Sequence, residues 1–303
     1  MTDWSPEWTI RGSGYVAVVA GVGATLRRLE HNGRDLVVPF GAEEIRPVYR
    51  GALIAPWPNR IADGRYSWKG RDHQLPLNEV SLGHALHGLV QWIRWEPIDV
   101  HANRLVLAHD LVPQDGYPFA LSLRVAFEVG DDGLTTVLRA TNRGAEAVPY
   151  GCCPHPYLTP GSGRLDDWLL TLPASRRVEV DERLIPSDEA AVDAVDCDFR
   201  ADAVIGDRQI DHAFTGLGRG ADGDATVRIV DPEAGTGVQM SWGAWASWVQ
   251  IHTADRPEPS LHRAGLAVEP MSCLPDAFND PAGAPSLAPG AAHEAAWTIS
   301  VTA

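Results

Sequence analysis

The chain has 303 residues, of which 40 are acidic and 25 basic, and its net charge of −15 argues against nucleic acid or an anionic membrane surface as a partner. It contains no apolar run long enough to span a bilayer, and residues 1–11 lack the apolar core of a signal peptide. We therefore expect a cytoplasmic protein. The four cysteines form no CxxC pair and are too few for a disulfide scaffold, so we expect reduced thiols.

Strand signals dominate from the start of the chain. Tyr15–Ala20 and Ala24–Glu30 are strand-like, and Asn32-Gly33 is typical of a hairpin turn before Asp35–Pro39. Along Leu121–Val129, apolar residues alternate with polar or small ones. This alternation predicts a strand with one buried face.

The same signal recurs later, and no segment holds helical periodicity over three turns. Alternating segments include Leu134–Thr141, Val238–Trp242, Val249–Ile251 and Trp297–Val301. The Ala- and Asp-rich segment Asp188–Ala203 is expected to hold a short helix or a long loop. Many short strands between turns, with no repeat and no linker, predict an all-β sandwich or barrel that forms one domain over residues 1–303.

Two stretches in the first third carry polar residues with possible binding roles. Asn59-Arg60 follows two prolines and a tryptophan, which hold the backbone in a non-helical shape. The Arg60 guanidinium suits an oxygen-rich ligand, although an arginine that caps a turn would fit the pattern as well. His84 and His87 would point to opposite faces of a strand, so a shared metal is disfavoured. His87 is expected to face a pocket.

Three more polar sites follow in the second half. His155 stands between Pro154 and Pro156, which favour extended backbone, and a histidine held in this way suits proton transfer. A rigid loop with an ordinary histidine is the competing interpretation. Asp211 can accept hydrogen bonds from two hydroxyls or form a turn, and Gln250 interrupts an apolar strand, where its amide faces either a ligand or solvent.

Glu269 ends the apolar run Leu266–Val268 and is followed by Pro270. The proline should stop the strand, which places the carboxylate at a strand end, where a pocket can open. Burial there raises the pKa of a carboxyl group unless it is paired. From this stretch alone, a structural ion pair and a catalytic carboxylate are about equally good interpretations.

Taken together and in order, these motifs resemble the aldose 1-epimerases, or galactose mutarotases. The shared order is Asn-Arg, His-Gly, His-Pro-Tyr, Asp-His-x-Phe, Val-Gln and Glu-Pro-Met, and it extends from about Leu26 to the end of the chain. The resemblance implies a large antiparallel β-sandwich with a shallow sugar cleft, no cofactor and no metal. It leaves a monomer and a homodimer equally open.

The resemblance also implies roles for individual residues. His155 matches the general acid of the family and Glu269 the general base. The positions that match substrate-binding residues are Asn59, Arg60, His87, Tyr157, Asp211 and Gln250. The sequence departs from the family pattern at Leu158, where an aromatic residue is common, and at Pro270–Met271, where a polar residue is common after the glutamate.

The forms NRIADGRY, CCPHPYL and EPMSCLPDAF are similar to a bacterial branch that includes sulfosugar (sulfoquinovose) mutarotases. A mutarotase for an anionic sugar, either a sulfosugar or a hexose phosphate, is therefore an alternative to one for neutral aldoses. Arg60, Arg65 and Arg94 are the candidates for facing an anionic group.

The implied chemistry needs only one acid and one base, expected on opposite sides of the bond between C1 and O5, and the two groups should titrate as a coupled unit. A non-catalytic carbohydrate-binding sandwich would need neither group. A glycosidase would need two carboxylates, for which Asp211 and Glu269 are available. A metal-dependent cupin-like enzyme would need clustered histidines, which the sequence does not offer.

Overall fold

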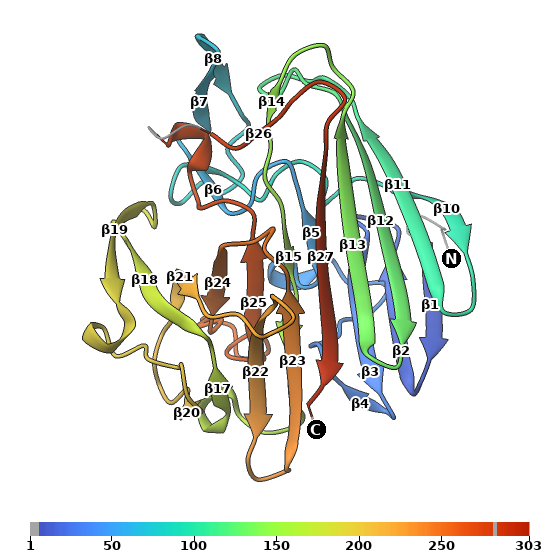
Figure 1. Ribbon diagram of the computed structural model, residues 1–303, viewed down its shortest axis with the longest axis vertical. Helices are drawn as coiled ribbons and strands as arrows, with labels where there is room; N and C mark the ends of the chain where they lie inside the picture. Colours follow the sequence, from blue (N-terminus) through green and yellow to red (C-terminus); the bar gives the residue numbers. More distant parts are fainter. Residues whose placement is uncertain (1–5, 281–283, 303) are drawn as a thin grey trace.

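The computed structural model describes residues 6–280 and 284–302, and within these ranges the fold consists of antiparallel strands (Figure 1). Helix occurs there only as single 3-10 turns, none of them long and apolar enough to cross a bilayer. These turns are η1 (Pro47–Tyr49), η2 (Leu165–Asp167), η3 (Val192–Ala194) and η4 (Ala277–Asn279). The prediction of an all-β antiparallel fold is confirmed.

The largest sheet has nine strands, all antiparallel to their neighbours. From edge to edge they are β10 (Glu96–Val100), β11 (Arg104–Leu111), β12 (Leu121–Gly130), β13 (Gly133–Asn142), β27 (Ala292–Val301), β23 (Thr236–Trp242), β22 (Ala225–Asp231), β17 (Leu169–Thr171) and β20 (Ala203–Val204). The last strand along the chain, β27, lies in the middle of this sheet.

A four-stranded sheet packs against one half of the large sheet. It consists of β1 (Glu7–Gly12), β2 (Tyr15–Ala20), β3 (Thr25–His31) and β4 (Arg34–Asp35), and β1 and β2 contact β12. The expected alternation in β12 is present, because Leu123, Val125 and Phe127 are buried while Arg124 and Glu128 are exposed. Asymmetric burial of this kind holds the two sheets together over an apolar core.

A six-stranded sheet carries most of the polar residues singled out above. Its order is β16 (Tyr157–Leu158), β25 (Leu266–Met271), β24 (Trp248–His252), β21 (Asp211–Leu217), β18 (Ala174–Val180) and β19 (Pro186–Ala191). Figure 1 shows β18, β21, β24 and β25 on the opposite side of the view from β11–β13. Val249, Ile251 and Val268 join the same hydrophobic cluster as the core of the large sheet.

One local expectation is met in part and another is corrected. The segment Asp188–Ala203 contains the short helical turn η3, as expected, but it begins inside the edge strand β19, which pairs with β18 and exposes Asp188 and Glu189. Pro270 does not end its strand, since β25 continues to Met271. On one side of β25 the ladder to β16 ends at Ala267, so the amide hydrogen that proline lacks has no strand to bond there.

Short two-stranded ladders complete the part of the chain that the structure describes. They pair β5 (Ala52–Ile54) with β15 (Cys153–His155), β6 (Arg60–Ala62) with β9 (His84–Leu86), β7 (Arg65–Trp68) with β8 (Arg71–Gln74), and β14 (Val148–Pro149) with β26 (Ser286–Leu287). All four cysteines are buried and unpaired, as expected for reduced thiols.

Candidate active site

A cleft of about 720 Å³ opens at the six-stranded sheet and the ladders beside it. Seven of the eight residues that the sequence singled out for a sugar site line this cleft: Asn59, Arg60, His87, His155, Asp211, Gln250 and Glu269. They come from six separate segments of the chain, and only the fold brings them together.

The base of the cleft is formed by neighbouring strands of the sheet. Gln250 on β24 lies directly opposite Glu269 on β25, and Asp211 begins the next strand, β21. The Gln250 Nε2 group donates a hydrogen bond of 2.7 Å to Asp211 Oδ1. Gln250 and Glu269 are 3% and 2% exposed, so these polar side chains are almost fully withdrawn from solvent. Gln250 is therefore paired in register with Glu269 on one side and hydrogen-bonded to Asp211 on the other.

His155 reaches Glu269 from outside the sheet. It ends β15, whose partner is β5, and its Nε2 atom lies 3.2 Å from Glu269 Oε1. The imidazole and the carboxyl group therefore lie side by side, whereas the acid and the base were expected on opposite sides of the C1–O5 bond. A side-by-side pair can still face both oxygens on C1, because these oxygens are bonded to the same carbon.

Three rings lie close to the imidazole of His155, those of Tyr157, His87 and Tyr49. The Tyr157 ring stacks on it at 5.5 Å and 21°, and the His87 ring meets it edge-on at 5.1 Å. The Tyr49 ring lies 4.6 Å from His87 and 6.1 Å from His155. Tyr157 is 1% exposed and does not line the cleft. Its position behind His155 favours orienting the imidazole over contacting a ligand.

Arg60 does not present a free charge to the cleft. Its Nε and Nη2 groups donate to the two carboxylate oxygens of Glu79 at 2.8 and 2.9 Å, a bidentate ion pair. The Arg60 Nη1 group donates to Asn59 Oδ1 at 3.2 Å, which ties the two adjacent residues together. Glu79 was not identified from the sequence, because nothing in its local pattern marks it as the partner of an arginine nineteen positions earlier.

Burial acts on the two central groups in opposite directions. It raises the pKa of Glu269 well above its usual range, the charge of Asp211 raises it further, and Arg60 opposes both. Burial lowers the pKa of His155 to about 3, helped by the positive charge of His252. Both groups thus resist carrying a lone charge, while their 3.2 Å contact lets them share one proton between them.

A second charged cluster lies beside this pair. Burial alone would raise the pKa of Asp211, but His252, Arg60 and the hydrogen bond from Gln250 together lower it, so Asp211 is ionised at neutral pH. The His252 Nδ1 atom lies 3.7 Å from Asp211 Oδ1, and Arg256 Nη2 lies 3.4 Å from His252 Nε2.

Besides Glu79, the cleft residues that the sequence did not indicate include Tyr49, His252 and Arg256. The period of two along β24 carries a signal for one of them, since His252 follows Gln250 by two residues and both line the cleft. Tyr49 ends the 3-10 turn η1 and Arg256 lies in an irregular segment, so neither had such a signal.

Several buried polar atoms of the cleft have no partner among the described residues. They are Glu269 Oε2, Gln250 Oε1, His87 Nδ1 and His155 Nδ1. Buried polar atoms are nearly always hydrogen-bonded in folded proteins, and a cluster of exceptions inside a cleft is typical of a site that binds a polar ligand. The donors and acceptors in this cleft suit hydroxyl groups.

The two histidines of the Gly83–Val90 stretch lie in different surroundings. His87 lines the cleft, whereas the His84 Nε2 atom lies 2.9 Å from the carbonyl oxygen of Arg183 and His84 does not line it. In the part of the chain that the structure describes, no group of three or more His, Cys, Asp or Glu residues is placed to hold a metal ion.

The chain is similar in sequence or in fold to several known proteins. The chain is 37% identical over 266 residues to the uncharacterized protein YihR of Escherichia coli K12, a match that covers 88% of this chain and 83% of that protein. It is 27% identical to the galactose mutarotase of Sus scrofa, over 88% of this chain and 84% of that enzyme. A Caenorhabditis elegans GalM/aldose epimerase homologue has the same fold, with a TM-score of 0.86 at 21% identity over 99% of this chain and all of that one.

The match extends over nearly the whole chain. Residues 6–300 match the protein family described as aldose 1-epimerase. This range includes every strand that builds the cleft and every residue discussed above. The chain belongs to the aldose 1-epimerase family.

Proposed function

We propose that this protein is an aldose 1-epimerase, a mutarotase that interconverts the α and β anomers of an aldose. The observation that carries the proposal is the buried pair of His155 Nε2 and Glu269 Oε1, 3.2 Å apart in a cleft rich in hydroxyl-binding groups. A binding module would have no use for a buried acid–base pair, which is costly to desolvate.

In the proposed reaction, the Glu269 carboxylate takes the proton from the hydroxyl group on C1. The electrons of the O1–H bond form the C1=O1 carbonyl, the C1–O5 bond breaks, and O5 takes a proton from the His155 imidazolium. Rotation about C1–C2 presents the other face of the carbonyl to the O5 hydroxyl. Ring closure reverses the transfers: His155 recovers its proton from the O5 hydroxyl and protonated Glu269 gives its proton to O1, so that no net proton or electron is consumed.

The protonation of the pair suits this cycle. The ion pair of carboxylate and imidazolium and the neutral pair of carboxylic acid and imidazole contain the same number of protons. They differ only in the position of one proton along the 3.2 Å contact. Because burial disfavours both the removal and the addition of a proton, the reactive composition persists over a wide pH range around neutrality. In this proposal Asp211, Gln250, Asn59 and His87 hold the hydroxyl groups.

The test is the rate of anomer exchange, followed by polarimetry or exchange NMR with freshly dissolved single anomers. His155→Asn keeps a hydrogen-bonding shape but removes the transferable proton, and it should lower kcat by about 10²-fold or more. A matched control is His262→Asn, because His262 is exposed and lies outside the cleft. Activity of His155→Asn within a few-fold of wild type would move the acid role elsewhere, with His87 as the first candidate.

Two other functions have distinct outcomes in the same assay. A carbohydrate-binding protein without activity would bind sugars but leave the exchange rate at its spontaneous value. A glycosidase that uses Asp211 and Glu269 would release the aglycone from a nitrophenyl glycoside, which a mutarotase leaves intact. Chelator should leave the exchange rate unchanged, because acid–base ring opening needs no Lewis acid.

One observation favours an anionic sugar as the substrate. Three pairs of ionisable groups lie in the cleft: Arg60 with Glu79, His155 with Glu269, and Asp211 with His252, whose pKa is lowered by burial. Arg256 lines the cleft and forms no ion pair with any residue in the described ranges. A sulfonate or phosphate on C6 would supply the missing negative charge.

Of the three arginines that the sequence offered for this purpose, Arg60 is already paired, and Arg65 and Arg94 do not line the cleft. Arg256→Gln should therefore raise KM for sulfoquinovose or glucose 6-phosphate about tenfold and leave that for glucose unchanged. An equal change for charged and neutral sugars would assign Arg256 a structural role instead.

A further inference from the structure

A second pocket lies at the β7–β8 hairpin. The register of the two strands decides which side chains of the hairpin line it. Trp68 lies opposite Arg71 and Tyr66 lies opposite His73, so these four side chains share one face of the hairpin. The other face carries Arg65, Ser67, Asp72 and Gln74. The hairpin thus presents three rings and one guanidinium group on a single face.

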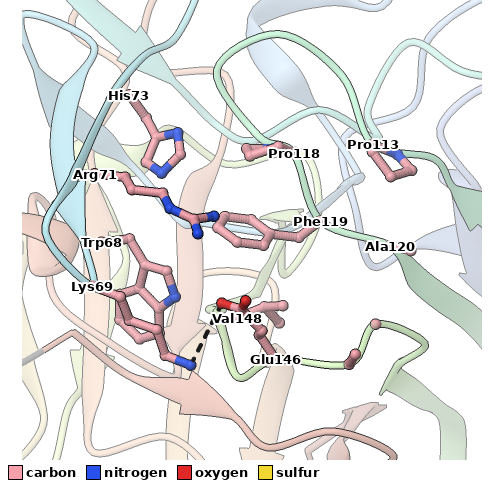
Figure 2. Close-up of a pocket in the computed structure, with 12 residues that line it drawn as sticks. Trp68, Lys69, Arg71, His73, Pro113, Pro118, Phe119, Ala120, Glu146 and Val148 are labelled. Carbon is pink, nitrogen blue, oxygen red and sulfur yellow. Dashed lines mark ion pairs between the residues drawn. The ribbon is translucent and has the colours of Figure 1, made fainter.

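Two loops face this side of the hairpin and enclose a pocket of about 470 Å³ (Figure 2). One loop contributes Pro113, Pro118 and Phe119, and the other contributes Glu146 before Val148. Figure 2 shows Arg71 and Phe119 reaching toward each other across the pocket, with Trp68 beside them. No residue lines both this pocket and the cleft, so the two sites are separate.

Hydrogen bonds hold the walls of this pocket in place. The Tyr66 hydroxyl donates to the carbonyl oxygen of Gly116 at 2.7 Å, and Trp68 Nε1 donates to that of Ala147 at 2.9 Å. The His73 ring meets the Phe119 ring edge-on at 5.7 Å. Each loop is therefore tied to the hairpin, and a ligand would not have to order the walls when it binds.

The charge of this pocket is positive in a protein whose net charge is −15. Lys69 lies 3.9 Å from Glu146, so these two charges largely compensate each other. Burial lowers the pKa of His73, which leaves its ring neutral at pH 7. Arg71 forms no ion pair with any residue between 6 and 280 or between 284 and 302, so its charge remains available to a ligand.

We propose that this pocket binds a small organic anion with a flat apolar body, at a site distinct from the cleft. The rings of Trp68 and Phe119 and the neighbouring prolines would cover the flat body, and Arg71 would bind the sulfonate, carboxylate or phosphate group. Trp68, Arg71 and Phe119 would together select a ligand that has both a flat apolar body and an anionic group. A neutral ligand of the same shape would leave the guanidinium group unpaired.

Naphthalene-2-sulfonate and 2-naphthol are suitable probes, because they share a ring system and only the first is charged at pH 7. Titration followed by amide NMR should place the sulfonate at residues 69–71, 116–120 and 144–147. Arg71→Gln should weaken sulfonate binding about tenfold and leave 2-naphthol within twofold. Phe119→Ala should weaken both probes, and thermal unfolding will show whether it remains folded.

Arg65→Gln is the matched control, because Arg65 lies on the opposite face of the same hairpin and bonds Gln74 there. It should leave both affinities unchanged, and Arg71→Gln should keep wild-type anomer exchange. Equal binding of sulfonate and naphthol, unchanged binding by Arg71→Gln, or shifts confined to the cleft residues would each overturn the proposal.

Discussion

Strands β12 and β25 each lie between two partner strands, but they bury different side chains. In β12, every second residue is apolar and buried, and the residues between them are exposed or half-buried. In β25 all six residues are buried, and one of them is Glu269. Regular alternation serves the stability of the fold, whereas the break in it at Glu269 places a costly polar group where chemistry can use it.

Of the substitutions that compare β25 with β12, one at Glu269 is expected to have the largest effect, and this effect is on kcat. Glu269→Gln keeps the size and one hydrogen-bonding oxygen but cannot take a proton, so kcat should fall by about 10²–10⁴-fold. The free energy of unfolding should stay the same or rise, because a buried ionisable group is removed. Polarimetry and urea unfolding measure the two quantities.

Glu189→Gln, at an exposed position of β19, is the control for the Glu269 variant and should change neither quantity. A near-normal kcat in Glu269→Gln, combined with loss of activity in an Asp211 variant, would reverse the roles of the two carboxyl groups.

In β12, a substitution is expected to lower the free energy of unfolding and leave kcat unchanged. Leu123 is fully buried and apolar, so Leu123→Ala should lower the free energy of unfolding by about 2–5 kcal/mol through lost burial and the cavity left behind. The kcat of the folded fraction should stay at the wild-type value. Urea unfolding and initial rates below the melting transition test this, and a parallel loss of kcat would show that the two regions are coupled.

Asp211 is expected to behave as a binding residue rather than as a base. Asp211→Asn loses charge-assisted hydrogen bonds worth about 1.5–3 kcal/mol, so affinity for a sugar should fall at least tenfold while kcat changes little. Titration calorimetry with a methyl glycoside, which cannot mutarotate, measures affinity without turnover. Asp193→Asn, an exposed position, should leave affinity unchanged.

The smallest effect concerns pH. Between pH 4.5 and 6.5, the usual pKa values of glutamate and histidine, the unfolded chain binds one proton at Glu269 and His155 in sum, and so does the native pair. Above pH 6.5 the native pair holds the extra proton, so stability falls as pH rises. Below pH 4.5, down to the His155 pKa of about 3, the unfolded chain binds more protons, and stability falls as pH falls.

In His155→Asn only the glutamate contributes, and its raised pKa makes stability decline with rising pH from about 4.5 onward. The slope is at most about 1.4 kcal/mol per pH unit. Urea unfolding between pH 4 and 8, compared with wild type, measures it. The same pH dependence in both proteins would show that the two groups do not share a proton.

Much of the fold could be predicted from the sequence. A strand that buries one face has an apolar residue at every second position, as along Leu121–Val129. The prediction of strands failed where a strand is buried on both faces, as in β25, or is mostly exposed, as in β19. Pro270 was taken as a strand end, but a missing partner strand at that position lets β25 continue. The edge strand β19 has no apolar alternation to detect, since most of its residues are exposed.

The site was predictable only in part, for a related reason. Motif order brought His155 and Glu269 to notice, but no local pattern shows that Glu79 neutralises Arg60 or that Arg256 has no ion-pair partner within the described ranges. Such facts depend on contacts between segments far apart in the chain. The position of Tyr157 could not be predicted either: its side chain stacks on the imidazole of His155 and does not line the cleft.

The position of β27 has a consequence for synthesis of the chain. This strand, Ala292–Val301, joins β13 to β23 and so connects the two halves of the nine-stranded sheet. Until it emerges from the ribosome, β13 and β23 each present an unpaired edge, which is a template for aggregation. A nascent chain stalled before residue 292 should therefore be captured by chaperones and sensitive to protease, and release of β27 should close the sheet in one cooperative step.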